Sequence, residues 1–220
     1  MKPEAFSVDA LLRMRRTRKL LDGPRLSAQA TGTAARLAFD ASLRAAISSA
    51  GWAPFHYACD PELPEPWRFT VLDRDALDTM MVRFPQCLPG KLPSIVAGAG
   101  AMVQVSFCAE QDLALTARNE DHHSATAAAA MALLLACEER GLGSYWCTAH
   151  VLNAPELRAW CGMDPQERWL GAIFVGLPLS PEREAAEGFS GKLRGRRTSA
   201  GAGWMRWVGG DGGATLKATE

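Results

Sequence analysis

Hydrophobic and small residues recur with a helical period over one long uninterrupted stretch, residues 119–140. Strong helix formers dominate this stretch, and little in it would stop a helix before Gly141. At about 1.5 Å per residue the helix would be roughly 33 Å long, the width of a small domain. We therefore expect it to be central, with an alanine face that allows close approach of another backbone and a leucine face that neighbours cover.

A glycine turn follows this predicted helix. The sequence Gly141-Leu142-Gly143 predicts a C-cap with one or two positive φ angles. Residues 144–148 would then return into the protein as a strand.

Other segments show the period of strands or of shorter helices. Alternation predicts strands at 67–72 and 101–107, and a continuous apolar run predicts a buried strand at 170–175. Loops are predicted at 27–33 and 85–93, and helices at 8–19, 40–50, 73–84 and from the capping box Asn153–Glu156 to Gly162. Because the strands are few and unevenly spaced, we expect an α+β fold with an open, mostly antiparallel sheet of about four to five strands flanked by helices.

The end of the chain differs in character from the rest. Glycine, serine and charged residues dominate after Pro181, yet Trp204 and Trp207 need a surface that buries them. We expect one domain over residues 1–210, with 181–210 packed on a partner subunit and 211–220 as a flexible tail.

Charge and composition exclude several classes of protein. The chain has 24 basic and 24 acidic residues, so its net charge gives no reason to expect nucleic acid or a membrane as partner. The apolar run 125–137 is too short to cross a bilayer, and the N-terminus lacks a secretory pattern. Six irregularly spaced cysteines are typical of reduced thiols in a cytoplasmic protein. His122 and His123 are adjacent, without ligand spacing, so we expect no metal site.

Two basic clusters and one aromatic loop are the candidate functional features. The run Arg15-Arg16-Thr17-Arg18-Lys19 is either a solvated helix end or an anion site, because guanidinium groups suit phosphate oxygens. A second cluster contains Lys192 and Arg194. The proline-rich segment 52–66 carries aromatic residues that either plug the edge of the core or wall a flat apolar slot. Signatures of catalytic nucleophiles and of phosphate-cradling loops are missing, so these features together suit a flat aromatic cofactor with one phosphate.

Four motifs occur in a suggestive order along the chain. They are Arg15-Arg16-Thr17-Arg18-Lys19-Leu20-Leu21-Asp22, Ala53-Pro54 leading to Pro66-Trp67-Arg68-Phe69, Gly141-Leu142-Gly143-Ser144-Tyr145-Trp146, and Leu170-Gly171-Ala172-Ile173-Phe174-Val175-Gly176-Leu177-Pro178. In this order, over roughly residues 8 to 197, the chain resembles the FMN-dependent nitroreductase family.

The resemblance implies a set of FMN-binding residues. Those at the phosphate and the polar edge of the flavin would be Arg15, Arg16, Thr17, Lys19, Lys192 and Arg194. Those along the ring would be Pro54, Phe55, His56, Tyr145, Trp146, Cys147 and Thr148. No protein side chain is implied as the catalytic group, because the flavin N5 carries the chemistry.

The resemblance also implies an activity and an assembly. NADH or NADPH would reduce FMN, and a nitroaromatic, quinone or related acceptor would then take the electrons in a ping-pong hydride transfer. The protein would be a homodimer with FMN in the subunit interface and the long helix at the dimer core.

The loop around residue 55 departs from the family pattern. Phe55-His56-Tyr57 stand where the family has polar residues, the loop is longer, and Lys19 replaces an arginine. These departures leave two alternatives open: a flavin-binding module without turnover, or another flavoenzyme of the same fold, namely a ring dehydrogenase, a dehalogenase or a flavin-processing enzyme. A nucleic-acid surface made by the basic clusters is disfavoured by the neutral charge balance.

Overall fold

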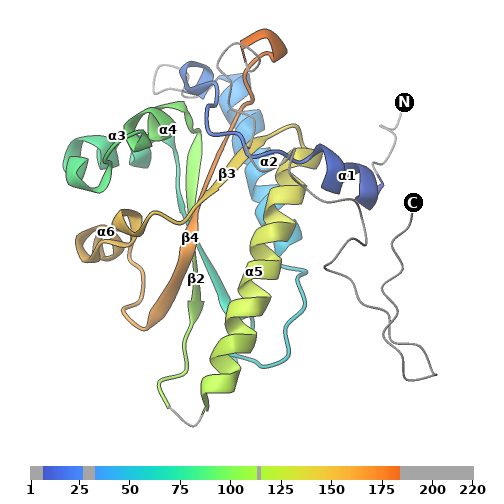
Figure 1. Cartoon of the computed structure of the whole chain (residues 1–220), viewed down its shortest axis with the longest axis vertical. Coiled ribbons are helices and arrows are strands. Elements are labelled where there is room, and N and C mark those ends of the chain that lie inside the picture. The colour runs from blue at the N-terminus through green and yellow to red at the C-terminus, as the bar shows by residue number, and fades with distance from the viewer. Residues whose placement is uncertain (1–6, 27–32, 113–114, 184–220) are drawn as a thin grey trace, which may run out of the picture. The chain divides into compact units, whose positions relative to one another are not determined.

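The computed structural model describes residues 7–26, 33–112 and 115–183. Within these residues one sheet of four strands has the order β1-β2-β4-β3, and every neighbouring pair is antiparallel (Figure 1). The strands are β1 (Trp67–Leu72), β2 (Ala101–Cys108), β3 (Gly143–Cys147) and β4 (Glu167–Gly176). The predicted α+β class with a mostly antiparallel sheet is thereby confirmed.

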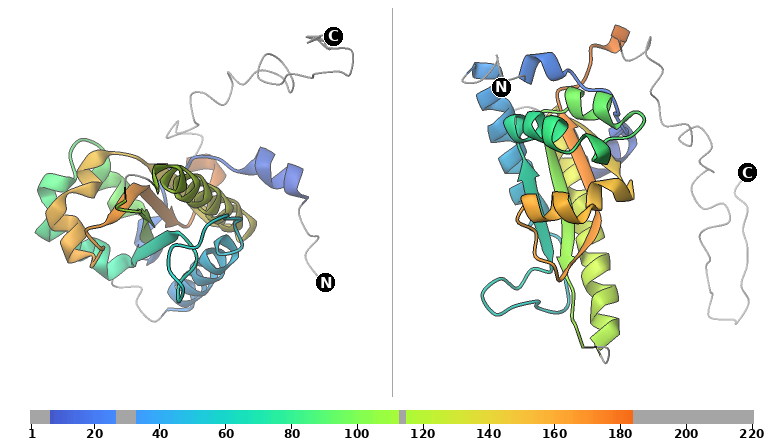
Figure 2. Two further views of the ribbon diagram at one scale, coloured as in Figure 1. Left: turned by 90° about the horizontal axis from the view of Figure 1, so that it is seen from below. Right: turned by 90° about the vertical axis from the view of Figure 1, so that its left-hand side faces the viewer.

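Helices cover both faces of this sheet (Figure 2). One face is covered by α2 (Ala34–Ala50) and α5 (Thr116–Glu139), and the other by α3 (Arg74–Arg83), α4 (Leu92–Gly98) and α6 (Pro155–Trp160). Short 3-10 turns are η1 (Gly23–Leu26), η3 (Pro85–Cys87) and η5 (His150–Asn153), and the first helix, α1 (Val8–Met14), contacts α5. Two hydrophobic layers therefore enclose the sheet.

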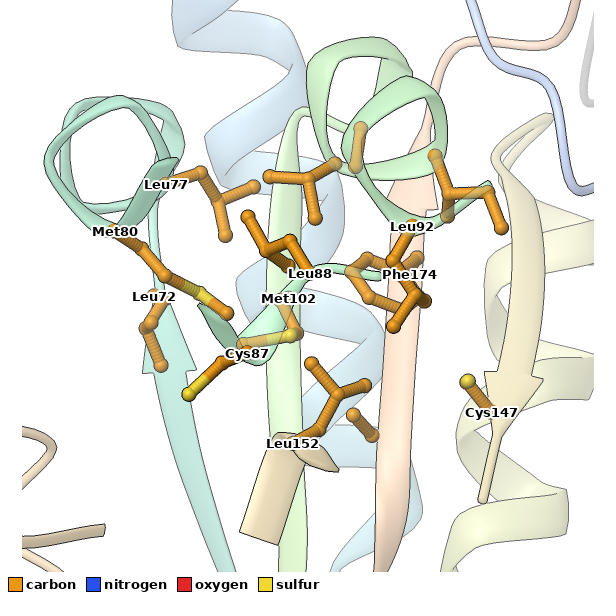
Figure 3. Close-up of a cluster of buried hydrophobic side chains, with 14 of the residues drawn as sticks. Leu72, Leu77, Met80, Cys87, Leu88, Leu92, Met102, Cys147, Leu152 and Phe174 are labelled. Atoms are coloured by element: carbon orange, nitrogen blue, oxygen red, sulfur yellow. The ribbon is translucent and has the colours of Figure 1, made fainter. Parts of the chain in front are cut away.

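The central strands β2 and β4 are buried on both faces. On the α3 side, Met102 and Phe174 meet leucines from the surrounding helices (Figure 3). The polar Gln104 also lies on this side, where it donates to Leu152 O at 3.1 Å and accepts from Trp169 Nε1 at 2.7 Å. Because these hydrogen bonds satisfy it, the amide can be buried at little cost.

The end of α5 is a Schellman motif, as the glycine turn predicts. Gly141 has φ 71°, its N–H donates to Glu138 O at 3.1 Å, and Leu142 N–H donates to Cys137 O at 2.8 Å. The motif reverses the chain directly into β3, which begins at Gly143.

The first predicted helix is wrong in its second half. The structure ends α1 at Met14, whereas the periodicity extends a helix through the basic run. Arg18 N–H instead donates to Ser144 O at 2.9 Å, so this segment joins the sheet edge rather than a helix. Pairing with distant residues here outweighs the local preference for a helix.

Four further features differ from the prediction. Helix α2 begins at Ala34, where Thr33 caps it, rather than at Asp40. The predicted capping box before α6 does not form, because Ala154 is the N-cap and Asn153 accepts from Arg158 instead. Helix α4 begins at Leu92, inside the predicted loop at 85–93, and was not predicted. Strand β4 begins at Glu167 rather than at residue 170.

No helix among the described residues is long and apolar enough to cross a membrane. The predicted packing of 181–210 on a partner subunit and the predicted tail at 211–220 concern residues that, from 184 onward, lie outside the described part of the chain.

Replacing Gly141 with Ala should lower the free energy of unfolding by about 1 kcal/mol, since a Cβ is disfavoured in the left-handed region. No atom lies within 4 Å of the position that this Cβ would occupy, so steric overlap does not contribute. Gly141→Asn is the matched control, because asparagine adopts this conformation more readily. Urea denaturation should rank the proteins wild type, Asn, Ala, and equal midpoints for the two variants would contradict the argument.

Candidate functional site

The basic segment that follows α1 lies along the ends of two strands. Thr17 forms a parallel bridge with Ser144, and Leu21 forms an antiparallel bridge with Pro178. Asp22 N–H also donates to the carbonyl of residue 177 at 2.8 Å. Backbone pairing with β3 and with the chain that leaves β4 therefore fixes residues 17–22 at one end of the sheet.

Two side chains of this segment point inward and anchor it. Arg18 Nη1 lies 2.7 Å from Glu138 Oε2 near the end of α5, and the two side chains are only 17% and 7% exposed. Leu21 is buried against Gly143, where a Cβ would come within 2.5 Å of its Cδ2. Glycine at position 143 thus permits the close approach of the segment to β3.

Lys19 lies over the aromatic ring of Tyr145, the second residue after the glycine turn. Its Nζ lies 5.1 Å from the ring centroid of Tyr145, and that ring stacks on Phe174 at 6.2 Å between centroids. Burial, and then a hydrogen bond with the Cys147 thiol, raises the pKa of Tyr145 to about 12. The phenol therefore stays protonated and uncharged at neutral pH, beside an exposed cation.

Side chains alternate between the two faces of the sheet along β3, so the residues predicted to contact the flavin ring, 145–148, do not all lie on one face. Tyr145 and Cys147 pack with the α3 side of the sheet, whereas Trp146 packs with the α5 side, and Thr148 is exposed. Ser144 is 1% exposed, and its Oγ has no hydrogen-bond partner among the described residues. A buried hydroxyl without a partner is uncommon and marks this end of β3 for a ligand or water.

The predicted contacts Pro54, Phe55 and His56 lie elsewhere in the chain. The Phe55 ring meets Trp67 edge-on at 5.6 Å and packs with Ala125 in the first half of α5. The chain that follows α1 instead lies at the other end of that helix (Figure 1), where Arg18 pairs with Glu138 in the last turn. The two positions on α5 are about 20 Å apart at the helical rise. A single chain therefore does not bring the two predicted groups together.

Sequence reasoning missed two residues that shape the site. Ser144 directly follows the glycine turn, and this position was the signal available in the sequence. Only the fold shows that its hydroxyl has no partner among the described residues. Phe174 supports Tyr145 because the two are partners in the β3–β4 register, and this pairing is not visible in either segment alone.

The predicted Lys192 and Arg194 lie outside the described residues. The part of the chain that is described contains no metal-binding group of three or more His, Cys, Asp or Glu residues.

Several solved structures share this fold. They include a nitroreductase-like family protein from Bacillus cereus (17% identity, TM-score 0.62, covering 82% of this chain and 90% of that one). A nitroreductase family protein from Clostridium novyi NT has 16% identity and a TM-score of 0.58 over 80% and 88% of the two chains. A nitroreductase with bound FMN from Bacteroides fragilis has 18% identity and a TM-score of 0.54 over 80% and 91%. At these identities the likeness shows the fold alone.

Among curated proteins none matches the sequence. The model of the Nitroreductase family, in contrast, matches residues 12–177, which include the basic segment, α5, the glycine turn and the whole sheet. The chain therefore belongs to the nitroreductase family.

Proposed function

We propose that the protein is an FMN-dependent oxidoreductase that takes electrons from NADH or NADPH and passes them to a nitroaromatic, quinone or related acceptor. Family membership supports this proposal, as does the bound FMN of the similar Bacteroides fragilis structure. The observation that carries it is the anchored basic segment, which sets Lys19 over Tyr145 and lies beside the unpaired hydroxyl of Ser144.

Arg15, Arg16 and Thr17 are proposed to hold the phosphate. Guanidinium groups bind phosphate oxygens through paired hydrogen bonds, and a threonine hydroxyl adds a further donor. The next residue, Arg18, is fixed by its ion pair with Glu138, so the segment is positioned before any ligand arrives. Such preorganisation lowers the entropy cost of binding. Residues Lys192 and Arg194 are proposed as additional phosphate contacts.

Lys19 is proposed to act on the flavin ring through its charge. Bound FMN supplies the hydride chemistry, and a cation beside the ring favours the reduced, negatively charged form. The Tyr145 ring holds Lys19 in place and, being neutral at physiological pH, does not cancel the lysine charge.

A second copy of the chain is proposed to complete the site with Pro54, Phe55 and His56. These residues lie about 20 Å from the basic segment along α5, too far to contact the same ring within one chain. Helix α1 buries none of its residues, and its apolar Val8, Leu12 and Met14 are 69%, 43% and 43% exposed. Such a helix suits an interface. The half-buried stripe of Ala127, Met131 and Leu135 offers α5 for the same contact.

Freshly purified protein should be yellow, with the absorbance of bound flavin, and Arg15→Ala/Arg16→Ala should lose most of that colour. The reason is that the double variant removes the paired donors to the phosphate, each contributing roughly 1.5–3 kcal/mol. Arg13→Ala is the matched control, since Arg13 is exposed and pairs only locally, with Asp9 in α1. Flavin released by heat should be quantified per chain, and full retention by the double variant would refute the phosphate assignment.

The loaded protein should be bleached by NADH or NADPH under anaerobic conditions and should regain its colour when a quinone is added. Steady-state kinetics with varied reductant and acceptor should give the parallel lines of a ping-pong mechanism. Bound flavin without bleaching by either nucleotide would favour the binding module over the enzyme.

Sedimentation velocity should give twice the 23.7 kDa of one chain, with one FMN per chain. Leu12→Glu should weaken the dimer and its flavin content together, because it places a charge on the exposed apolar face of α1. Val82→Glu is the control, because Val82 is 84% exposed on α3. A monomer that retains flavin would contradict the proposed shared site.

A further inference from the structure

An arginine in the first turn of α5 connects segments of the chain that are distant in sequence. Arg118 is the third residue of this helix, and no acidic residue accompanies it in the first turn. A cation there opposes the helix dipole, whose positive end lies at the N-terminus. The stability of the helix therefore does not account for Arg118, whereas its contacts with other segments do.

One contact of Arg118 is with the connection that precedes α5. Its Nη1 lies 3.6 Å from Glu110 Oε1. The backbone of Glu110 is itself fixed by the side chain of Asn119, which accepts from the Glu110 N–H at 2.8 Å and donates to the Glu110 carbonyl at 3.1 Å. Asn119 is only 7% exposed, so these two hydrogen bonds are shielded from water. Glu110 is therefore held beside α5, where it restricts the position of the Arg118 guanidinium.

The other contact of Arg118 is with the loop at residues 52–66, which passes the first half of α5 (Figure 1). The guanidinium carbon lies 5.3 Å from the ring centroid of Tyr57, within the range of a cation–π interaction. Phe55 of the same loop packs with Ala125, seven residues further along α5. Because positions seven apart lie on one face of a helix, a single face of α5 holds the loop at two points.

We propose that Arg118 is a positioning residue for the acceptor: by holding Tyr57, it keeps the loop in the conformation that completes the acceptor pocket with Phe55 and His56. This inference rests on the proposed function, in which these residues complete the site of a second copy. His56 is exposed and stands between the two held residues, so its placement depends on both contacts. The edge-on contact of Phe55 with Trp67, at 5.6 Å, fixes only one side of His56.

Loss of the contact should change binding rather than chemistry. Arg118 is not among the residues proposed to contact FMN, so its replacement leaves the flavin and its hydride chemistry in place. When only a fraction of the loop is in its binding conformation, the apparent Kd of the acceptor rises by the inverse of that fraction. The Arg118 side chain and Tyr57 are 42% and 44% exposed. A cation–π contact at such exposure changes a population about two- to fivefold.

The kinetic test is Arg118→Gln in the full-length protein loaded with FMN, with a quinone as acceptor. KM for the quinone should rise roughly two- to fivefold, while kcat and flavin content stay at their wild-type values. Arg118→Lys keeps a cation over the ring and should restore KM, whereas a purely helical role would not separate lysine from glutamine, which have similar helix propensities. Arg83→Gln is the matched control, because Arg83 makes the same kind of contact on α3, 5.4 Å from the Phe84 ring.

Chymotrypsin provides a readout of the loop that needs no flavin. The protease cleaves after Tyr57 only when the ring leaves Arg118 and enters the protease pocket, so cleavage follows the released population. The fragment 1–57 should appear about two- to fivefold faster in Arg118→Gln than in the wild type, Arg118→Lys or Arg83→Gln.

The outcomes separate this role from the proposed function. If the wild type is active, an unchanged KM in Arg118→Gln would overturn the positioning role. Equal cleavage of the glutamine and lysine variants would overturn it as well. A wild type without reducible flavin would instead refute the proposed oxidoreductase, and the role of Arg118 in its reaction with it.

Discussion

The ion pair between Arg18 and Glu138 is the interaction on which the geometry of the candidate site depends. It joins the basic segment to the last turn of α5 while both side chains are largely removed from solvent. A charge in such a position is costly if its partner is missing, so the pair enforces one placement of the segment. Leu21 adds an apolar anchor against Gly143. With Arg18 and Leu21 anchored, the exposed Lys19 between them lies over the ring of Tyr145.

The elements that depend on local periodicity were predictable, and those that depend on distant pairing were not. Helix α5 and its glycine turn were predicted well because the helical period and the C-cap both lie within the segment itself. The basic run was predicted as helix, since nothing in its own sequence reveals the bridge between Thr17 and Ser144. Helix α4 was missed because Pro93 was interpreted as a breaker, although proline is tolerated in the first turn.

The same division applies to the candidate site. Residue types gave the basic segment and the motif after α5, but not the face on which each side chain of β3 lies. That face follows from the register with β4, which pairs Tyr145 with Phe174 and sends Trp146 to the opposite side. The buried Ser144 hydroxyl is likewise a property of the assembled fold. Sequence motifs can therefore name a strand as functional before they can say which of its side chains face a ligand.

Helix α5 is the element that relates the two groups of residues proposed to contact FMN. In its first half, Ala125 packs with Phe55, which lies in the same loop as Pro54 and His56. In its last turn, Glu138 holds Arg18 beside the unpaired hydroxyl of Ser144. Hydrogen bonds within a helix of this length keep the two ends at a fixed separation, because shortening or bending it would break the ladder that its alanine-rich sequence favours. The Phe55 loop and the basic segment are thus held about 20 Å apart within one chain, and for this reason the proposed site draws them from two copies.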